Sequence, residues 1–240
     1  MKDYLLDIIK NTHAIGKVPL VKIVGDENET KLTAIADERL FVVDGRFHNV
    51  IPDFIGRFGL PNLSRLAVTL NTEEYRENAQ ISIVRDQNEP TGIHFENKHG
   101  DFKNDYRVMN SKVVDSLLPD VTFTGATWHV EITPSIQSIQ RMKAQSVINS
   151  EETLFYAKTD TSGNLIFNFG DPASLSGQFV FASGVKGQLK AERAWPVGCV
   201  LSILSLNGDK TMKFSSDGVA MITVDSGLAV YNYILLAQQK

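Results

Sequence analysis

The two halves of this 240-residue chain echo one another, and this repetition constrains the fold more than any other feature of the sequence. Near the end of each half, a strand-like run leads to a turn glycine, and a tyrosine follows six residues later. Gly100 and Tyr106 occupy these places in the first half. Gly227 and Tyr233 occupy them in the second half, 127 positions further along.

A second pair of landmarks lies upstream in each half, in the same order. Pro61 begins a segment containing LSRLAVTLN, and Pro196 begins one containing LSILSLN, so that Asn71 pairs with Asn207. The separation here is 136 positions, so the loops differ in length between the halves. In a chain of 240 residues, these offsets predict two copies of one module of roughly 120 residues, a common domain size.

The segment between the two copies reads as a linker. Residues 109–126 show no clean periodicity and contain Pro119 and Gly125. They also hold too many apolar residues for a merely solvated tether, so we expect the linker to lie against a sheet. The expected organisation is therefore a first module at 1–108, a linker at 109–126 and a second module at 127–240.

Most of the chain consists of short segments in which apolar and polar residues alternate, separated by turn residues such as Asp217-Gly218. This pattern is typical of antiparallel sheets built from hairpins. The segments are LTAIA (32–36), QISIV (80–84), GIHFE (92–96), TWHVEIT (127–133), NLIFNF (164–169), QFVFA (178–182), TMKFS (211–215) and VAMITV (219–224).

Four segments favour helices, two in each module. Proline suits the first position of a helix, and Thr133 before Pro134 is a candidate N-cap. The expected helices run from Asp3 to Thr12, from Pro61 to about Leu70, from Pro134 to about Ile148 and from Pro196 to Ser205. Each module would thus have one helix at its start and one in its middle.

Helical spacing divides the third of these segments into two faces. One face is apolar, and the opposite stripe is polar, cationic at its centre and free of carboxylates. The apolar face consists of Ile136, Ile139 and Val147, and the polar stripe of Gln137, Arg141 and Gln145. Lys143 falls on the apolar side and would have to extend to its rim. For one helix alone, an ordinary solvated face explains the polar stripe better than a binding surface does.

Composition narrows the class of protein. Hydrophobic residues make up 42% and charged residues 22%, as in ordinary soluble proteins. The single cysteine, Cys199, excludes an intrachain disulfide framework and fits a reducing cytoplasm. Asp3 and Asp7 interrupt the first apolar stretch, which argues against a signal peptide, and no run is long enough to span a bilayer. The net charge of −4 does not by itself indicate nucleic-acid binding.

No pattern of residues indicates catalysis. The five histidines are scattered, a single cysteine cannot form a zinc-binding pair, and the sequence has no GxxxxGK[ST], GxSxG or GxGxxG motif. Cys199 lies in an apolar helical run, where a buried small residue is more common than a nucleophile. We therefore expect a protein that is not an enzyme and that uses no cofactor or metal.

Three segments resemble the sliding clamps, and most closely the DNA polymerase clamps of bacteriophages, which are similar in fold to proliferating cell nuclear antigen. The segments are IIKNTHAIG (8–16), PNLSRLAVTLN (61–71) and the long stretch from Trp195 to Leu235. The resemblance implies an α+β fold of two similar modules, each of antiparallel sheet with two helices. It also implies a ring of six modules, and hence a homotrimer, in the cytoplasm of a bacterial host.

The resemblance further implies a function. A clamp encircles double-stranded DNA without reading its sequence, tethers the replicative DNA polymerase and is loaded by a separate clamp loader. Its helices line the hole, so the cations expected to face DNA are Lys10, Lys17, Arg57, Arg65, Arg141, Lys143 and Lys210. Asp3 and Asp7 depart from this pattern, because carboxylates facing the hole would repel DNA.

Clamps also bind a short apolar peptide of their partner between the linker and the C-terminal strand. The matching residues here are Leu40, Leu117, Leu118, Pro119, Val121, Leu235 and Leu236. For any one of these leucines, simple coverage of the sheet is an equal explanation.

Two other functions remain open at the level of sequence. One is a β-rich phage structural or assembly protein that does not encircle DNA, and the other is a monomeric module that binds sugar or peptide. The clamp alone accounts for helices placed twice over, a cation at the centre of a helical face and an apolar linker. A sugar-binding module would show clustered exposed aromatics, whereas Trp128 and Trp195 fall at a strand and at a helix start.

Overall fold

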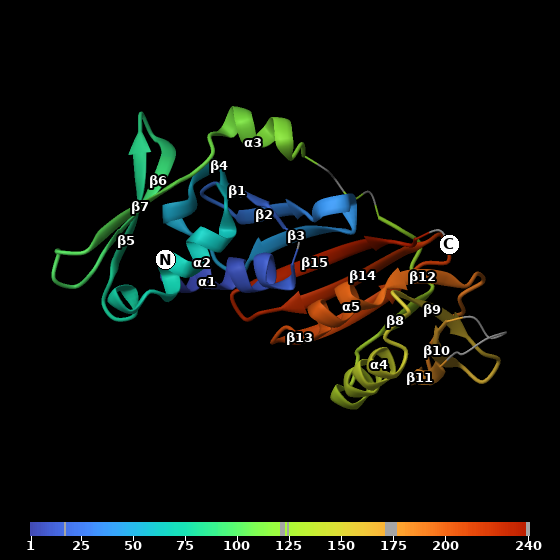
Figure 1. The fold of residues 1–240 in the computed structure, drawn as a ribbon. Coiled ribbons are helices and arrows are strands. Elements are labelled where there is room, and N and C mark those ends of the chain that lie inside the picture. Colours follow the sequence, from blue (N-terminus) through green and yellow to red (C-terminus); the bar gives the residue numbers. More distant parts are fainter. Residues whose placement is uncertain (17, 121–122, 124, 171–176, 239–240) are drawn as a thin grey trace. The chain divides into compact units, whose positions relative to one another are not determined.

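The computed structural model describes residues 1–16, 18–120, 123, 125–170 and 177–238 (Figure 1). The chain divides into two compact units. Unit 1 comprises Met1–Thr122 and Ser226–Tyr231, and unit 2 comprises Phe123–Asp225 and Asn232–Lys240. The C-terminal hairpin is therefore shared, with its turn in unit 1 and its last residues in unit 2.

Unit 1 combines antiparallel strands with three helices. Four strands pair in the order β4-β1-β2-β3, and three more in the order β5-β6-β7. The elements are α1 (Lys2–Asn11), β1 (Leu20–Gly25), β2 (Thr30–Ile35), β3 (Phe41–Phe47), β4 (Gly56–Pro61), α2 (Leu63–Asn71), β5 (Gln80–Asp86), β6 (Glu89–Glu96), β7 (Lys103–Arg107) and α3 (Ser111–Leu117). Short 3-10 turns lie at His13–Ile15, Asp37–Arg39, Pro52–Phe54 and Glu73–Tyr75.

Unit 2 also combines antiparallel strands with helices, and its described residues form two α-helices. Its strands pair in the orders β11-β10-β9-β12 and β14-β13-β8. The elements are β8 (Val130–Ile132), α4 (Ile136–Ile148), β9 (Leu154–Thr159), β10 (Asn164–Phe169), β11 (Gly177–Ser183), β12 (Arg193–Pro196), α5 (Val197–Leu204), β13 (Asp209–Phe214), β14 (Val219–Asp225) and the part of β15 (Ala229–Leu236) that follows Tyr231.

One order of elements occurs twice. A helix, four strands, a second helix and three strands follow one another from α1 to β7 and again from α4 to β15. The four-stranded parts also agree, because β4-β1-β2-β3 has the same connectivity as β12-β9-β10-β11. Gly100 and Gly227 both adopt positive φ, 75° and 88°, in hairpin turns. Tyr106 and Tyr233 are both buried. The structure confirms the predicted α+β fold of two similar modules.

Apolar side chains from the sheets and helices fill each unit. In unit 2 the core is unusually aromatic: the rings of Phe167 and Phe181 stack with centroids 4.3 Å apart, and Trp195 lies edge-on to Phe214 at 5.2 Å. In unit 1, α1 buries Leu5 and Ile8. The remaining faces of the helices are therefore free to carry polar residues. Among the described residues, no helix is both long and apolar enough to cross a membrane.

Several predicted details differ from the structure. The linker segment contains a helix, α3, which the sequence did not suggest. Thr133 is not the N-cap of the third predicted helix, because Ser135 takes that place and accepts a hydrogen bond from the Ser138 N–H at 3.0 Å. The strand expected at 127–133 is shorter, spanning Val130–Ile132. Strand β1 was missed because nearly all of its residues are buried, so apolar and polar residues do not alternate along it.

Candidate nucleic-acid interface and linker helix

In unit 1, helices α1 and α2 pack together and expose one predicted cation each. Lys10 is exposed near the C-terminal end of α1, and Arg65 is exposed on α2, whose Leu66 and Leu70 are buried. Asn62 fixes the start of α2: its side chain accepts a hydrogen bond from the Arg65 N–H at 3.4 Å. This places the Arg65 side chain on the outer surface of the first turn.

Asp7 does not lie on that exposed surface. Its Oδ2 accepts hydrogen bonds from the Ser226 hydroxyl at 3.0 Å and the Tyr231 hydroxyl at 2.7 Å. Burial raises the pKa of the Asp7 carboxyl, and these two hydrogen bonds act against that rise. Asp7 therefore ties α1 to the turn and first residues of β15. Asp3, by contrast, is exposed in the first turn of α1, where a carboxylate complements the helix dipole.

Helix α4 in unit 2 presents a different face from the one predicted. Met142 is fully buried, whereas Ile136 and Val147 are 77% and 69% exposed. Two of the three residues of the apolar stripe read from the sequence are therefore on the outside, whereas Ile139 is half-buried, and Met142 is the one buried residue of the helix. Lys143 is exposed on α4. Lys143 therefore reaches solvent directly and does not have to extend past a buried apolar face.

Arg141 lies at the flank of α4, beside β11. Its Nη1 donates to the carbonyl oxygen of Val180 at 3.4 Å, and its Cζ lies 5.4 Å from the centre of the Phe179 ring. The second contact is a cation–π interaction. Arg141 remains exposed, so its guanidinium both packs on the strand and faces solvent.

Two further predicted cations, Arg57 and Lys210, are on strands and not on helices. Arg57 lies on β4 and Lys210 on β13, so the placement on helices that motivated their prediction does not hold for either. Lys210 donates to the carbonyl oxygen of Gly208 at 2.9 Å, and burial lowers its pKa. Lys17 lies outside the described residues. Helix α5 carries no cation between Val197 and Leu204.

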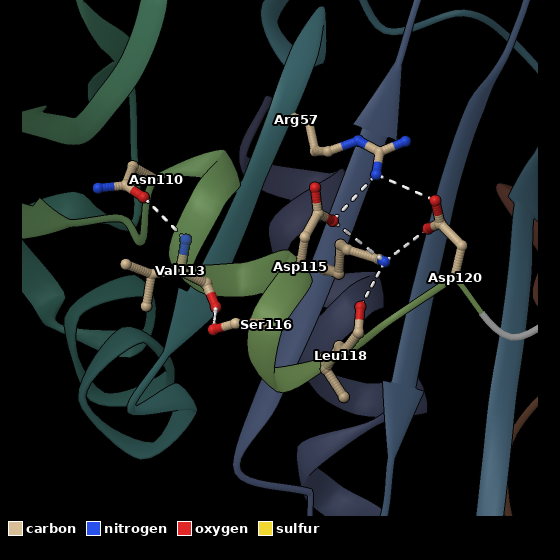
Figure 2. Close-up of polar contacts among 8 residues, drawn as sticks. Arg57, Asn110, Val113, Asp115, Ser116, Leu118 and Asp120 are labelled. Atoms are coloured by element: carbon tan, nitrogen blue, oxygen red, sulfur yellow. Dashed lines mark hydrogen bonds and ion pairs between the residues drawn. The ribbon is translucent and has the colours of Figure 1, made fainter.

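Helix α3 lies on unit 1 against β4 and is the most distinctive part of the linker (Figure 2). Its N-cap is Asn110, whose Oδ1 accepts a hydrogen bond from the Val113 N–H at 3.0 Å. Val114 is the one buried residue of the helix, whereas Val113 and Leu117 are 42% and 57% exposed. The two exposed side chains are four residues apart and thus share a face of the helix.

Four charged side chains hold the end of this helix in place. Lys22, only 1% exposed on β1, donates to Asp120 Oδ1 at 2.6 Å and lies 3.4 Å from Asp115 Oδ1. It also donates to the carbonyl oxygen of Leu118 at 2.5 Å. Arg57 Nη1 donates to Asp115 Oδ1 at 2.9 Å and to Asp120 Oδ2 at 3.1 Å (Figure 2). We call Lys22, Arg57, Asp115 and Asp120 the linker charge network.

The network shifts the pKa values of Asp120 and Arg57 in the directions that ion pairing requires. Hydrogen bonds from Lys22 and then Arg57 lower the pKa of Asp120. Hydrogen bonds to Asp115 and then Asp120 raise the pKa of Arg57. Both shifts favour the charged forms of Asp120 and Arg57, and the network contains two basic and two acidic side chains.

The structure describes most of the residues expected in the peptide groove. In unit 1, Leu118 packs against Leu20 and Val114. Leu117 and Pro119 are exposed, and Leu40 is half-buried. In unit 2, Leu235 is fully buried and Leu236 is 61% exposed. Val121 lies outside the described residues.

Sequence reasoning missed the linker charge network altogether. A lysine inside the apolar run LVKIVG was a signal, because a lysine on a buried strand needs a carboxylate partner. The partners, Asp115 and Asp120, are 93 and 98 residues away along the chain. Nothing in the local pattern indicated which carboxylates they would be.

Comparison with solved structures places the fold among PCNA structures. PCNA from A. fulgidus, solved with the C-terminal region of FEN-1 bound, matches with a TM-score of 0.71 at 10% sequence identity, over 100% of this chain and 96% of that one. PCNA from Thermococcus kodakaraensis matches with a TM-score of 0.64 at 13% identity, over 99% and 95% of the two chains. No protein-family model matches the sequence, and neither does any curated protein.

Proposed function

We propose that the chain is a subunit of a sliding clamp, a non-enzymatic ring that encircles double-stranded DNA and tethers the replicative DNA polymerase. The observation that supports this best is the match of the whole duplicated fold to PCNA. The exposed cations on the helices of both units agree with it. A bacteriophage origin, and with it the cytoplasm of a bacterial host, is supported by the resemblance in sequence.

The DNA-facing residues of this proposal are the exposed cations on α1, α2 and α4. They are Lys10, Arg65, Arg141 and Lys143. Flexible cations on helices meet phosphates without reading bases, which suits a ring that must slide. Arg57 and Lys210 are weaker candidates, since Arg57 is already paired with two carboxylates and Lys210 is partly buried.

Ring closure would join the edge of one chain to that of the next. Strand β7 is an edge of its sheet in unit 1 and β11 is an edge in unit 2. Beside β7, the exposed side chains of Val68 and Phe102 line a hollow of about 540 Å³. Beside β11, α4 exposes Ile136 and Val147. A second copy pairing its β11 with β7 would cover Val68 and Phe102, and two units per chain then require three chains.

Partner proteins would bind at the linker. The A. fulgidus PCNA was solved with a segment of FEN-1, so a clamp of this fold can hold a peptide of a replication enzyme. In this chain the peptide-binding residues that we propose on unit 1 are Leu40, Leu117, Leu118 and Pro119, and those that we propose on unit 2 are Leu235 and Leu236. A clamp loader would be a separate partner that opens the ring.

Primer extension tests the proposal directly. The polymerase and clamp loader encoded in the same genome should make longer products on a primed circular template when this protein is added. Reversing charge with Arg65→Glu and Lys143→Glu together should lower that stimulation by about tenfold near physiological salt, because fewer phosphates are neutralised. Native mass should remain trimeric.

The matched control is Arg46→Glu, which reverses an exposed cation on β3 that pairs with Glu29. It should leave stimulation unchanged. Full stimulation by the double variant would refute the proposed DNA-facing surface. A wild-type protein that assembles but never lengthens the products would instead indicate a structural protein that does not encircle DNA.

A further inference from the structure

Helix α3 is too short and too exposed to be held by packing alone. It spans Ser111–Leu117, and Val114 is its one buried residue. Isolated helices of this length are unstable in water, so tertiary contacts must fix it. Its N-terminal end has the Asn110 cap, and its C-terminal end has the linker charge network.

The network grips the chain on both sides of the end of the helix. Asp115 lies within the last turn and Asp120 lies beyond it, and both accept from Arg57. The carbonyl oxygen of Leu118, between them, accepts from Lys22. One lysine and one arginine, on neighbouring strands β1 and β4, thus define the position of a segment of six residues.

Because Lys22 is buried, its interactions with residues 115–120 form and break cooperatively. Its ammonium group is 1% exposed, and a buried ammonium without a carboxylate is strongly unfavourable. If residues 115–120 moved away, Lys22 would lose its carboxylates and the Leu118 carbonyl together. Intermediate positions of α3 are therefore disfavoured, and the segment is either docked or released.

We propose that the linker charge network is a latch that keeps α3 docked so that Val113 and Leu117 are presented to a partner protein. Lys22 and Arg57 are then positioning residues for partner binding, although neither touches the partner. The part of this inference that concerns partner binding rests on the proposed clamp function; the latch itself does not.

Hydrogen exchange on the full-length protein tests the latch without any partner. The Leu118 amide donates to the Val114 carbonyl oxygen at 2.8 Å and reports whether the helix is formed. Arg57→Gln should speed its exchange by about tenfold, since hydrogen bonds between charged groups are lost. Arg57→Lys, which keeps the charge, should restore much of the protection. Arg46→Gln removes a cation from a separate ion pair and should have no effect.

Unchanged exchange in both Arg57→Gln and Lys22→Met would overturn the latch. Lys22→Met keeps the shape of the buried side chain, so its folding can be checked by the exchange of β1 amides.

Primer extension with the same variants tests the positioning role. Lys22→Met, at a buried residue that is not proposed to face DNA, should raise the polymerase concentration needed for half-maximal stimulation by several-fold and leave the plateau near wild type, because α3 can still dock part of the time. Arg57→Gln should raise the same polymerase concentration. Faster exchange without a change in the polymerase requirement would overturn the positioning role. A wild-type protein that gives no stimulation at all would refute the clamp function, while the exchange data would still decide the latch.

Discussion

Asp7 illustrates how one half-buried carboxylate can organise two distant segments. It belongs to α1, yet it accepts hydrogen bonds from Ser226 and Tyr231, more than 200 residues away. Burial raises its pKa above the value of 3.8 that an exposed aspartate has. Its ionised form therefore depends on the two hydroxyl donors.

Removing one donor should cost stability in a pH-dependent way. At pH 7, Tyr231→Phe should lower the free energy of unfolding by about 1.5 kcal/mol, because a hydrogen bond to an ionised group is lost. As pH falls through the raised pKa of Asp7, the carboxyl becomes neutral in the folded state and the cost should shrink. Urea unfolding at pH 7 and pH 4 measures both values. If Tyr231→Phe destabilised the protein equally at pH 7 and pH 4, the ionisation of Asp7 would not determine the strength of this hydrogen bond.

Substitution of two glycines in the loop after β11 would distinguish the effect of backbone strain from that of steric conflict. Gly184 and Gly187 both have positive φ, 68° and 88°. A Cβ at Gly184 would meet nothing within 4 Å, whereas one at Gly187 would lie 1.9 Å from the carbonyl oxygen of His129. Gly184→Ala should therefore cost about 1 kcal/mol from the left-handed conformation alone.

Gly187→Ala should cost at least about 2 kcal/mol more than that, since backbone atoms must move. Thermal unfolding of the two variants side by side gives the difference. Similar melting temperatures would mean that the loop rearranges freely around His129.

At the scale of elements, α4 is the clearest case for a test. Met142 is fully buried and Val147 is 69% exposed, although the sequence had indicated that Val147 faces inward. Met142→Ala should destabilise the protein by about 3 kcal/mol, and Val147→Ala by less than about 0.5 kcal/mol. Chemical denaturation of both variants checks the orientation. If Val147→Ala lowered the stability more than Met142→Ala, Val147 would face the core, as the sequence had indicated.

The sequence predictions were correct for features that neighbouring residues determine, and wrong or missing for features that depend on distant contacts. Strands such as β10 and β14 could be predicted because one face of each is more exposed than the other, so apolar and polar residues alternate. The repeat could be predicted because its turn positions have positive φ, which favours glycine in both copies. Strand β1 has no such contrast. The orientation of α4 depends on which neighbours supply its core, and the partners of Lys22 depend on contacts across more than 90 residues. Neither is encoded in a local pattern.

For the whole molecule, duplication is the property on which the function depends. Two units of one topology expose cations on helices and leave the edges of β7 and β11 open within their sheets. Exposed apolar residues beside β7, Val68 with Phe102, need a covering surface. In the proposed clamp, a ring made of copies of this chain would provide that surface and an enclosed path for DNA at once.

The mass of the protein in native solution tests this claim most directly. At micromolar concentration, native mass spectrometry should show a species of three times the mass of one chain, with open-chain dimers a minor component. Val68→Glu, which places a charge beside β7, should reduce the trimer to monomers, while Arg46→Glu should not. A wild-type protein that is wholly monomeric at this concentration, or an assembly whose number of chains is not three, would contradict the ring.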